Sequence, residues 1–248
     1  MSDAPLAQAP LARFPDDGER GLAVVAHPDD LEYGAASAIA RWTSEGRTIA
    51  YVLVTRGEAG IDHMDPATVG PLRSAEESAS AAIVGVDDVA FLDGHADGTV
   101  EYGLPLRHDL AAAIRRHRPE VLISINRTAD WGPGTPPNHA DHRHVGAALL
   151  DAARDAANRW VFTDLLDAGL EPWPGVRLAA FNASPRPTHA VDVTGFLDRG
   201  IASLREHKVY LDGLGDDMDP DAFLRGNAEQ VGARQGVEHA TAFEVVPL

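Results

Sequence analysis

Two short clusters of histidine and carboxylate side chains could perform chemistry in this chain. The first places His27 three residues before Asp30, and the second is His139-Ala140-Asp141-His142. A neutral imidazole and a carboxylate are good zinc ligands, and a spacing of three residues at a helix start lets both converge on one point. The second cluster supplies candidates for a third ligand, and three protein ligands leave a coordination position open for water. The residues therefore predict a catalytic rather than a structural metal site.

Each cluster follows a run of apolar residues that is typical of a buried parallel strand. The first follows Val24 and Val25, and the second follows residues 121–125 after an intervening loop. Pro28 cannot continue a strand, so the backbone must turn there, and we expect a helix at about 31–45. Open α/β sheets bind ligands at the carboxyl ends of strands, where the strand order reverses. If the two strands are neighbours at that point, the two clusters meet.

Structural roles also explain either cluster taken alone. Asp29, Asp30 and Glu32 in a first helical turn are typical of helix capping and of a favourable interaction with the helix dipole. Asn138 and Asp141 are likewise suited to cap a later helix. Dinucleotide binding has weak support, because the first turn lacks G-x-G-x-x-G and the chain has no Walker A pattern. Both clusters combine histidine with aspartate after a strand, and this repetition favours the metal interpretation.

The rest of the chain reads as alternating strands and helices. We expect further strands at about 48–54, 89–92, 176–181, 190–192 and 243–246. We expect helices at about 73–84, 106–117 and 195–212, a helix that follows the second cluster and ends at about 157, and another that ends at about 235. Such βαβ units build a parallel sheet with helices on both faces. The prediction is an α/β fold with a mostly parallel β-sheet and a smaller C-terminal α+β portion.

The chain length fits one large domain. At 248 residues it buries a substantial core. We expect a flexible N-terminal segment at 1–20 and a single domain at 21–248, divided into a core at about 21–160 and a C-terminal portion at about 161–248. Without an apolar window long enough to span a membrane or a recognisable secretory signal, a cytoplasmic location is the default expectation.

Charge and composition exclude several classes of partner. The net charge of -17 argues against binding nucleic acid or anionic lipid, because both depend on Lys and Arg neutralising phosphates. The absence of cysteine excludes a thiolate metal site, so any metal must be held by His, Asp or Glu. We therefore expect a small-molecule partner, with no nucleic acid and no membrane, and a homo-oligomer is compatible with this sequence.

Taken together, the two clusters resemble those of the LmbE-like, or PIG-L, family of zinc-dependent N-deacetylases. The resemblance is carried by residues 26–34 (AHPDDLEYG) and 139–143 (HADHR), and weaker matches follow in the same order at 55–60, 73–85, 97–98 and 206–208. It spans about residues 22–210. Ala36 stands where a glycine is frequent and Ala140 where a proline is frequent, and neither departure removes a functional side chain.

The resemblance implies a Rossmann-like fold and a zinc ion, one per chain, held by His27, Asp30 and His142. Other divalent metals such as iron or cobalt are compatible with the same ligands. Asp29 is then free to act as general base. Zinc lowers the pKa of its water to about 7, so a nearby carboxylate can complete the deprotonation at neutral pH.

His139 and Asp141 are expected to complete the catalytic machinery. A protonated His139 would stabilise the oxyanion formed from the amide carbonyl, and Asp141 would accept a hydrogen bond from its ring. Either His139 or Asp29 then protonates the leaving amine. The roles of Glu32 and His207 stay undecided, and His144 is expected to point away from the metal.

Three further residues are candidates for substrate binding. Arg73 and Asp97 match positions that lie near the substrate in similar proteins, where they could hold sugar hydroxyls or a phosphate. Their alternative role is a surface ion pair. Trp131 is suited either to stack on a sugar or to fill the core of its loop.

The leading hypothesis is a hydrolase that removes the acetyl group from an N-acetylated amino sugar or its conjugate, releasing acetate and a free amine. Within enzymes, the alternative is an amidase that uses the same site on a larger acyl, thiol or antibiotic conjugate. An alternative of another class is a non-catalytic module that binds a metal or ligand.

Overall fold

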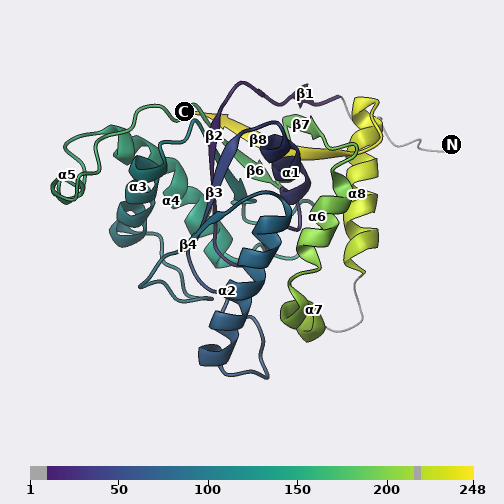
Figure 1. Ribbon diagram of the computed structural model, residues 1–248, viewed down its shortest axis with the longest axis horizontal. Coiled ribbons are helices and arrows are strands. Elements are labelled where there is room, and N and C mark those ends of the chain that lie inside the picture. The colour runs from purple at the N-terminus through teal and green to yellow at the C-terminus, as the bar shows by residue number, and fades with distance from the viewer. Residues whose placement is uncertain (1–9, 215–218) are drawn as a thin grey trace.

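A mixed sheet of eight strands forms the centre of the computed structural model, which describes residues 10–214 and 219–248 (Figure 1). The strands are β1 (Ala12–Arg13), β2 (Arg20–Val25), β3 (Thr48–Leu53), β4 (Asp88–Phe91), β5 (Val121–Ile125), β6 (Leu178–Asn182), β7 (His189–Asp192) and β8 (Ala240–Pro247). The helices are α1 (Ala36–Ser44), α2 (Pro66–Ile83), α3 (Leu104–His117), α4 (Ala140–Ala157), α5 (Asp164–Asp167), α6 (Leu197–Leu204), α7 (Lys208–Leu214) and α8 (Pro220–Gln235).

The strand order is β1-β7-β8-β6-β5-β2-β3-β4. Strands β6, β5, β2, β3 and β4 are parallel neighbours, whereas β8 pairs antiparallel with both β6 and β7. The chain moves from β2 to β3 and β4 on one side and then returns to place β5 on the other side of β2. The order therefore reverses between β2 and β5, which meets the condition set by the sequence analysis and brings the segments that follow both strands to one edge of the sheet.

Alternate residues of β2 face two apolar layers. Ala23 and Val25 pack with α1 and the end of α2, while Leu22 and Val24 pack with α3 and α4. Figure 1 shows α3 and α4 on one side of the sheet and α1 and α6 on the other. Because both faces are covered, the central residues of the parallel strands are mainly apolar. The fold is the Rossmann-like α/β arrangement expected from the sequence.

The C-terminal portion extends the same sheet. Strands β6, β7 and β8 continue it beyond β5, and α8 packs against β8. Part of the predicted flexible segment 1–20 lies outside the described residues, but the part from residue 10 onward is packed. There β1 pairs with β7, and the Phe14 ring contacts those of Trp42 and Phe243 with centroids 5.1 and 5.5 Å away. Burial of this ring explains the difference from the prediction.

Three helix boundaries differ from the sequence prediction. Helix α1 begins at Ala36 rather than near residue 31, because residues 29–34 form tight turns in which the N–H groups of Glu32 and Gly34 bond to carbonyls only three residues earlier. Helix α2 begins at Pro66 rather than near residue 73, because the Asp65 side chain accepts the Ala67 N–H and the helix continues through Pro71. The helix predicted at 195–212 is divided into α6 and α7, and the break directs His207 into the core.

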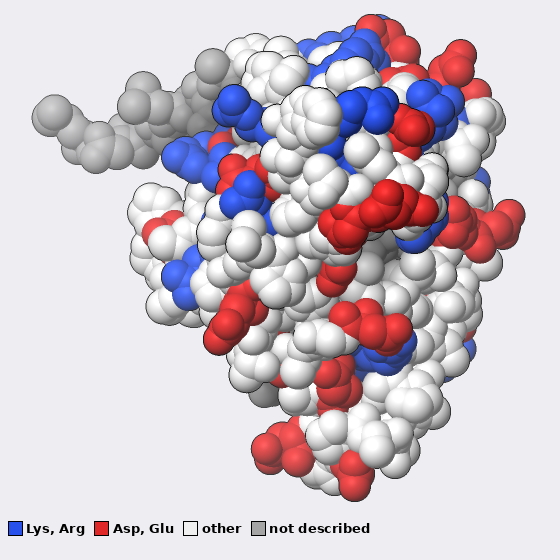
Figure 2. Space-filling view, turned by 90° about the vertical axis from the view of Figure 1, so that its left-hand side faces the viewer, with Lys and Arg blue, Asp and Glu red and all other residues white. Residues whose placement is uncertain are grey.

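The surface agrees with the acidic composition of the chain. Acidic and basic side chains are interspersed on the face drawn in Figure 2, and its lower half carries mainly acidic groups. None of the helices in the described part of the chain combines the length and apolar character that a bilayer-spanning segment requires.

Candidate active site

The turn after β2 is closed by the side chain of Asp30. Its Oδ2 accepts the backbone N–H groups of Ala26 and His27 at 3.1 and 3.0 Å. Helix α1 has Ala35 at its N-cap position and no side-chain cap. The capping alternative therefore does not hold for Asp30, whose carboxylate points back over the end of the strand.

The loop after β5 carries the second cluster into α4. Here the helix cap is His139, whose Nδ1 accepts the N–H of Asp141 at 3.2 Å. Asn138 does not cap the helix; its amide nitrogen donates to the carbonyls of Asn126 and Thr128 at 2.7 and 2.9 Å. These bonds tie the start of α4 to the end of β5, so that the position of the second cluster depends on the loop 126–138.

The three predicted metal ligands come together, with Asp30 between two histidines. Their ligand atoms all lie within 4.8 Å of one another, and Asp30 Oδ1 is 2.9 Å from Nε2 of His142. Nδ1 of His142 lies 2.9 Å from the amide oxygen of Asn138, so it must carry a proton. Nε2 of His27 contacts Asp141 at 3.2 Å. The other ring nitrogens, Nδ1 of His27 and Nε2 of His142, face Asp30 at 3.7 and 2.9 Å and are the nitrogens that could share a cation with it.

This donor set fits a divalent metal. Two imidazole nitrogens and a carboxylate are ligands that zinc uses in catalytic sites, and hydrogen bonds on the far side of each ring fix its tautomer. Burial lowers the pKa of His27, but hydrogen bonds to Asp141, Asp30 and Asp97 outweigh it and raise the pKa well above the ordinary value. Three carboxylates around one imidazole thus leave negative charge that a bound cation would neutralise.

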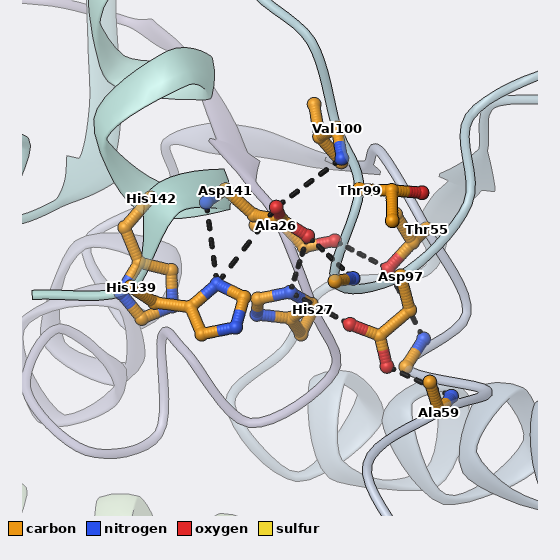
Figure 3. A network of polar contacts seen from close by, with 12 residues as sticks. Ala26, His27, Thr55, Ala59, Asp97, Thr99, Val100, His139, Asp141 and His142 are labelled. Atoms are coloured by element: carbon orange, nitrogen blue, oxygen red, sulfur yellow. Dashed lines mark hydrogen bonds and ion pairs between the residues drawn. The ribbon is translucent and has the colours of Figure 1, made fainter.

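Asp97 and Asp141 hold the outer edge of the His27 ring (Figure 3). Nε2 of His27 lies 3.1 Å from Asp97 and 3.2 Å from Asp141. The fully buried Asp141 also accepts the N–H groups of Gly98 and Val100 at 2.8 and 3.2 Å. The predicted hydrogen bond from the His139 ring to Asp141 is not made, because the carboxylate is engaged by these three groups and stays 3.9 Å from the ring nitrogen.

His139 stands at the mouth of the site. Its ring meets that of His27 edge-on, with centroids 5.0 Å apart, and its side chain is about half exposed. Because Nδ1 accepts the Asp141 N–H, the proton of the neutral ring resides on Nε2. Burial and the nearby charge of His27 lower the pKa of His139. In its neutral form this histidine is a hydrogen-bond donor through Nε2, whereas the sequence-based expectation was a protonated ring.

Asp29 is paired with Arg73 inside the protein. Its Oδ2 lies 3.3 Å from Nη2 of Arg73, and both side chains are buried. Nη1 of Arg73 donates to the carbonyl of Gly57 at 2.9 Å, and the guanidinium stacks on the Tyr210 ring, 4.4 Å from its centroid. Burial raises the pKa of Asp29 to about 6, with Arg73 opposing the shift and Asp30 adding to it. The surface ion pair considered for Arg73 and Asp97 is wrong: Arg73 holds Asp29, and Asp97 holds His27.

A cavity of about 480 Å³ opens over these groups. Its lining includes the three candidate ligands, Asp29, His139 and all three predicted substrate-binding residues, Arg73, Asp97 and Trp131. Sequence reasoning missed the aromatic side chains Tyr33, Tyr210 and Phe223, which also line it. Tyr33 belongs to the first motif and Tyr210 follows the weak match at 206–208, so proximity in sequence was an available signal for these two. Phe223 lies in α8, far from any motif.

A cluster of three buried polar side chains lies behind Asp29. The side chains of Glu32, Glu77 and His207 are buried, and Nε2 of His207 lies 3.7 Å from both carboxylates. Burial and the charge of Glu32 raise the pKa of Glu77 well above its ordinary value, whereas His207 lowers that of Glu32 despite burial. Oε2 of Glu77 accepts the N–H of Asp29 at 3.3 Å. These three side chains also have ligand atoms within 4.8 Å of one another.

His144 lies on the outer side of the site, as expected. Its Nδ1 contacts the carbonyl of Val100 at 2.6 Å, and the N–H of the same residue donates to Asp141. His144 therefore supports the segment that fixes Asp141 and contributes nothing to the candidate metal ligands.

Comparison with known proteins agrees with this geometry. A diacetylchitobiose deacetylase from Thermococcus kodakarensis is 27% identical over 239 residues, covering 94% of this chain and 85% of that protein. A 1D-myo-inositol 2-acetamido-2-deoxy-alpha-D-glucopyranoside deacetylase from Acidothermus cellulolyticus is 28% identical, covering 85% and 90%. The solved N,N'-diacetylchitobiose deacetylase from Pyrococcus horikoshii has the same fold, with a TM-score of 0.82, 24% identity, and coverage of 93% and 85%.

The family model described as PIG-L, GlcNAc-PI de-N-acetylase, matches residues 22–153. This stretch is more than half of the chain and runs from β2 to α4, so it contains both clusters and the point where the strand order reverses. The chain belongs to the PIG-L family.

Proposed function

We propose that this protein is a zinc-dependent hydrolase that removes the N-acetyl group from an amino sugar or amino-sugar conjugate, releasing acetate and a free amine. The observation that carries the proposal is the position of Asp29. A buried carboxylate that is not needed as a ligand opens into the same cavity as His27, Asp30 and His142. A binding module needs the ligands alone, whereas hydrolysis also needs a base.

The roles of the residues follow from their positions around the cavity. A zinc ion held by His27, Asp30 and His142 would lower the pKa of a bound water to about 7 and polarise the amide carbonyl. Asp29 takes a proton from the attacking water, and Arg73 fixes the orientation of this carboxylate through the contact at 3.3 Å.

His139 acts on the opposite side of the reacting carbonyl. Its Nε2–H is available because Nδ1 is engaged by the Asp141 N–H, and the ring lines the cavity beside His27. A donor in this position stabilises the negative charge that develops on the carbonyl oxygen. Asp141 and Asp97 keep the His27 ring in the orientation that a ligand needs. Asp29, once protonated, returns its proton to the leaving amine.

The substrate class rests on the relatives together with the cavity wall. Both curated relatives are named as deacetylases of N-acetylated amino-sugar compounds. The cavity offers Trp131 and Tyr33 as aromatic faces and Arg73 already paired with Asp29. Aromatic faces beside hydrogen-bonding groups suit the apolar face and the hydroxyl groups of a sugar ring.

The test compares Asp29→Asn with a matched surface variant, Asp87→Asn. Asparagine tolerates the positive φ of 95° at position 29 and keeps the size of the side chain. Acetate release from N,N'-diacetylchitobiose and N-acetylglucosaminyl inositol is measured along with the metal content. We expect Asp29→Asn to retain the metal and lose about 10²–10⁴-fold in rate, while the exposed Asp87 variant behaves as wild type. Undiminished acetate release by Asp29→Asn would refute the assignment of the base.

A further inference from the structure

The buried cluster of Glu32, Glu77 and His207 joins three distant parts of the chain. Glu32 comes from the turn after β2, Glu77 from α2, and His207 from the break between α6 and α7. Helix α2 packs against both α6 and α7 (Figure 1). Each of the three residues is at most 1% exposed, and they lie outside the lining of the active-site cavity. The hydrolysis proposed above therefore leaves their free ligand atoms without a task.

Several polar atoms of this cluster have no hydrogen-bond partner among the described residues. These are Oε2 of Glu32, Oε1 of Glu77 and both ring nitrogens of His207. The other oxygen of each carboxylate is engaged. Oε1 of Glu32 accepts the hydroxyl of Ser80 at 2.7 Å, and Oε2 of Glu77 accepts the N–H of Asp29 at 3.3 Å. Buried polar atoms without partners are rare in folded proteins, so a group of them in one place indicates a ligand.

The spacing within the cluster is closer to that of a coordination shell than to that of a hydrogen-bonded ion pair. Nε2 of His207 lies 3.7 Å from Oε2 of Glu32 and 3.7 Å from Oε2 of Glu77, and the ligand atoms of all three residues lie within 4.8 Å of one another. A charge-assisted N–H···O bond is about 2.7–2.9 Å long. Zinc binds nitrogen and carboxylate oxygen at about 2.0–2.2 Å, so neighbouring ligand atoms of a tetrahedral ion are about 3.4 Å apart. The observed gaps are closer to this second value.

The charge of the cluster also favours a cation. Two ionised carboxylates and one imidazole leave a net negative charge even when the ring is protonated. A buried charge that lacks a partner is strongly destabilising. A divalent ion balances both carboxylates and allows the ring of His207 to bind in its neutral form. A proton on Glu77 is the other way to remove the excess charge, and it differs from an ion in leaving no metal in the protein.

The donor set selects the kind of ion. One imidazole nitrogen and two carboxylate oxygens suit zinc or another divalent transition metal, whereas calcium and magnesium favour oxygen ligands. Three protein ligands leave one tetrahedral position, which a buried water can fill. Because all three side chains are buried, no substrate can reach such an ion. The site is therefore suited to a structural ion.

We propose that Glu32, Glu77 and His207 bind a second divalent transition-metal ion, separate from the metal of the candidate active site. This ion joins the turn after β2, helix α2 and the break between α6 and α7. It lies behind the residue assigned as the base, because Glu77 also accepts the N–H of Asp29. The proposal goes beyond the proposed function and does not depend on it.

The zinc content of His142→Ala tests the proposal without altering the buried cluster. Wild-type protein that has been loaded with zinc and freed of loosely bound ions by gel filtration should contain about two zinc ions per chain. His142→Ala should keep the buried ion, and His142→Ala/His207→Gln should keep none. His63 is exposed and belongs to no candidate ligand group in the described part of the chain, so His63→Gln serves as the matched control and should match the wild type. Folded His142→Ala without zinc would overturn the proposal.

Glu77→Gln distinguishes a metal ion from a proton on Glu77. Glutamine resembles a protonated carboxyl group but lacks the charge that a divalent ion requires. In the His142→Ala background, added zinc should raise the Tm of metal-stripped protein, and the further change Glu77→Gln should abolish this rise. An equal rise in both proteins, or no rise in either, would overturn the proposal. If no N-acetylated sugar releases acetate while His142→Ala still holds zinc, the proposed function fails and the buried site stands.

Discussion

Gly57 is the residue whose substitution tests how the candidate base is held. It has a φ of 62°, and a Cβ at this position would lie 2.2 Å from Nη1 of Arg73. The same Nη1 donates to the Gly57 carbonyl at 2.9 Å, while Nη2 lies 3.3 Å from Asp29. Non-bonded heavy atoms pack at about 3.5–4.0 Å, so Gly57→Ala must push the guanidinium away by about 1 Å.

Two costs add at this position. The left-handed backbone costs alanine about 1–2 kcal/mol, and breaking a buried ion pair costs up to about 3–5 kcal/mol when one partner is lost. Because the guanidinium is displaced and not removed, we expect Gly57→Ala to lower the free energy of unfolding by about 3–4 kcal/mol. A shift of about 1 Å in a group that orients a catalytic side chain can also lower the rate by about 10²-fold.

Gly46→Ala is the matched control. Gly46 has a φ of 90°, and a Cβ added there would have no other atom within 4 Å, so the substitution incurs only the backbone cost of about 1–2 kcal/mol. Urea denaturation followed by tryptophan fluorescence gives the free energies, and acetate release gives the rates. Equal losses of stability in the two variants, or wild-type acetate release by folded Gly57→Ala, would refute the argument that Arg73 is held by this contact and holds Asp29.

Three further predictions address the metal, the base and the surface. His142→Ala should lose the metal of the candidate active site and all acetate release. Chelation of the wild-type protein should abolish acetate release until zinc is restored. Full activity of the metal-free protein would exclude the proposed mechanism. Glu77→Leu should lower kcat about tenfold at unchanged KM, because the backbone N–H of Asp29 loses its hydrogen-bond acceptor, Oε2 of Glu77. Glu77→Gln keeps an acceptor oxygen and should recover most of the rate. Equal losses of kcat in the two variants would indicate that Glu77 has a packing role. Burial lowers the pKa of His108, but hydrogen bonds to Asp109 and Asp164 outweigh it and raise the pKa above 6.5. The protonated ring therefore stabilises the folded state fully below pH ~6.5, and this contribution is lost as the pH rises through the pKa of His108 in the folded protein. His108→Gln should accordingly lower Tm more in acid than in alkali.

The fold could be predicted as far as local patterns determine it. The βαβ spacing indicated a parallel sheet, and the rule that ligands gather where strand order reverses showed that the turn after β2 and the loop after β5 would meet if the two strands were neighbours. The choice of His142 as the third ligand came from the family resemblance and not from spacing. The packed segment at 10–20 was missed because its strand is two residues long and its burial depends on β7, which lies far along the chain.

Contacts between distant segments account for most of what sequence reasoning missed. Nothing near Arg73 indicates that it reaches Asp29, since the contact depends on how α2 packs beneath the first turn. Asp141 is only two residues from His139, and this proximity suggested a pair. In the structure Asp141 instead faces His27 across the sheet edge.

The adjacent aspartates show how one turn supports two kinds of chemistry. The φ of Asp29 is 95°, and the two consecutive carboxylates have different surroundings: that of Asp29 lies against Arg73, and that of Asp30 lies against His142 and the N–H groups of Ala26 and His27. Burial raises the pKa of both, but contacts with His142 and His27 outweigh it at Asp30 and hold that pKa far below its ordinary value, whereas burial prevails at Asp29. A pair of carboxyl groups whose surroundings push their pKa values apart is the arrangement that separates a permanent anion from a proton acceptor. Under the proposed function, these opposite pKa shifts suit Asp30 to stay ionised beside a cation and Asp29 to take up and release a proton.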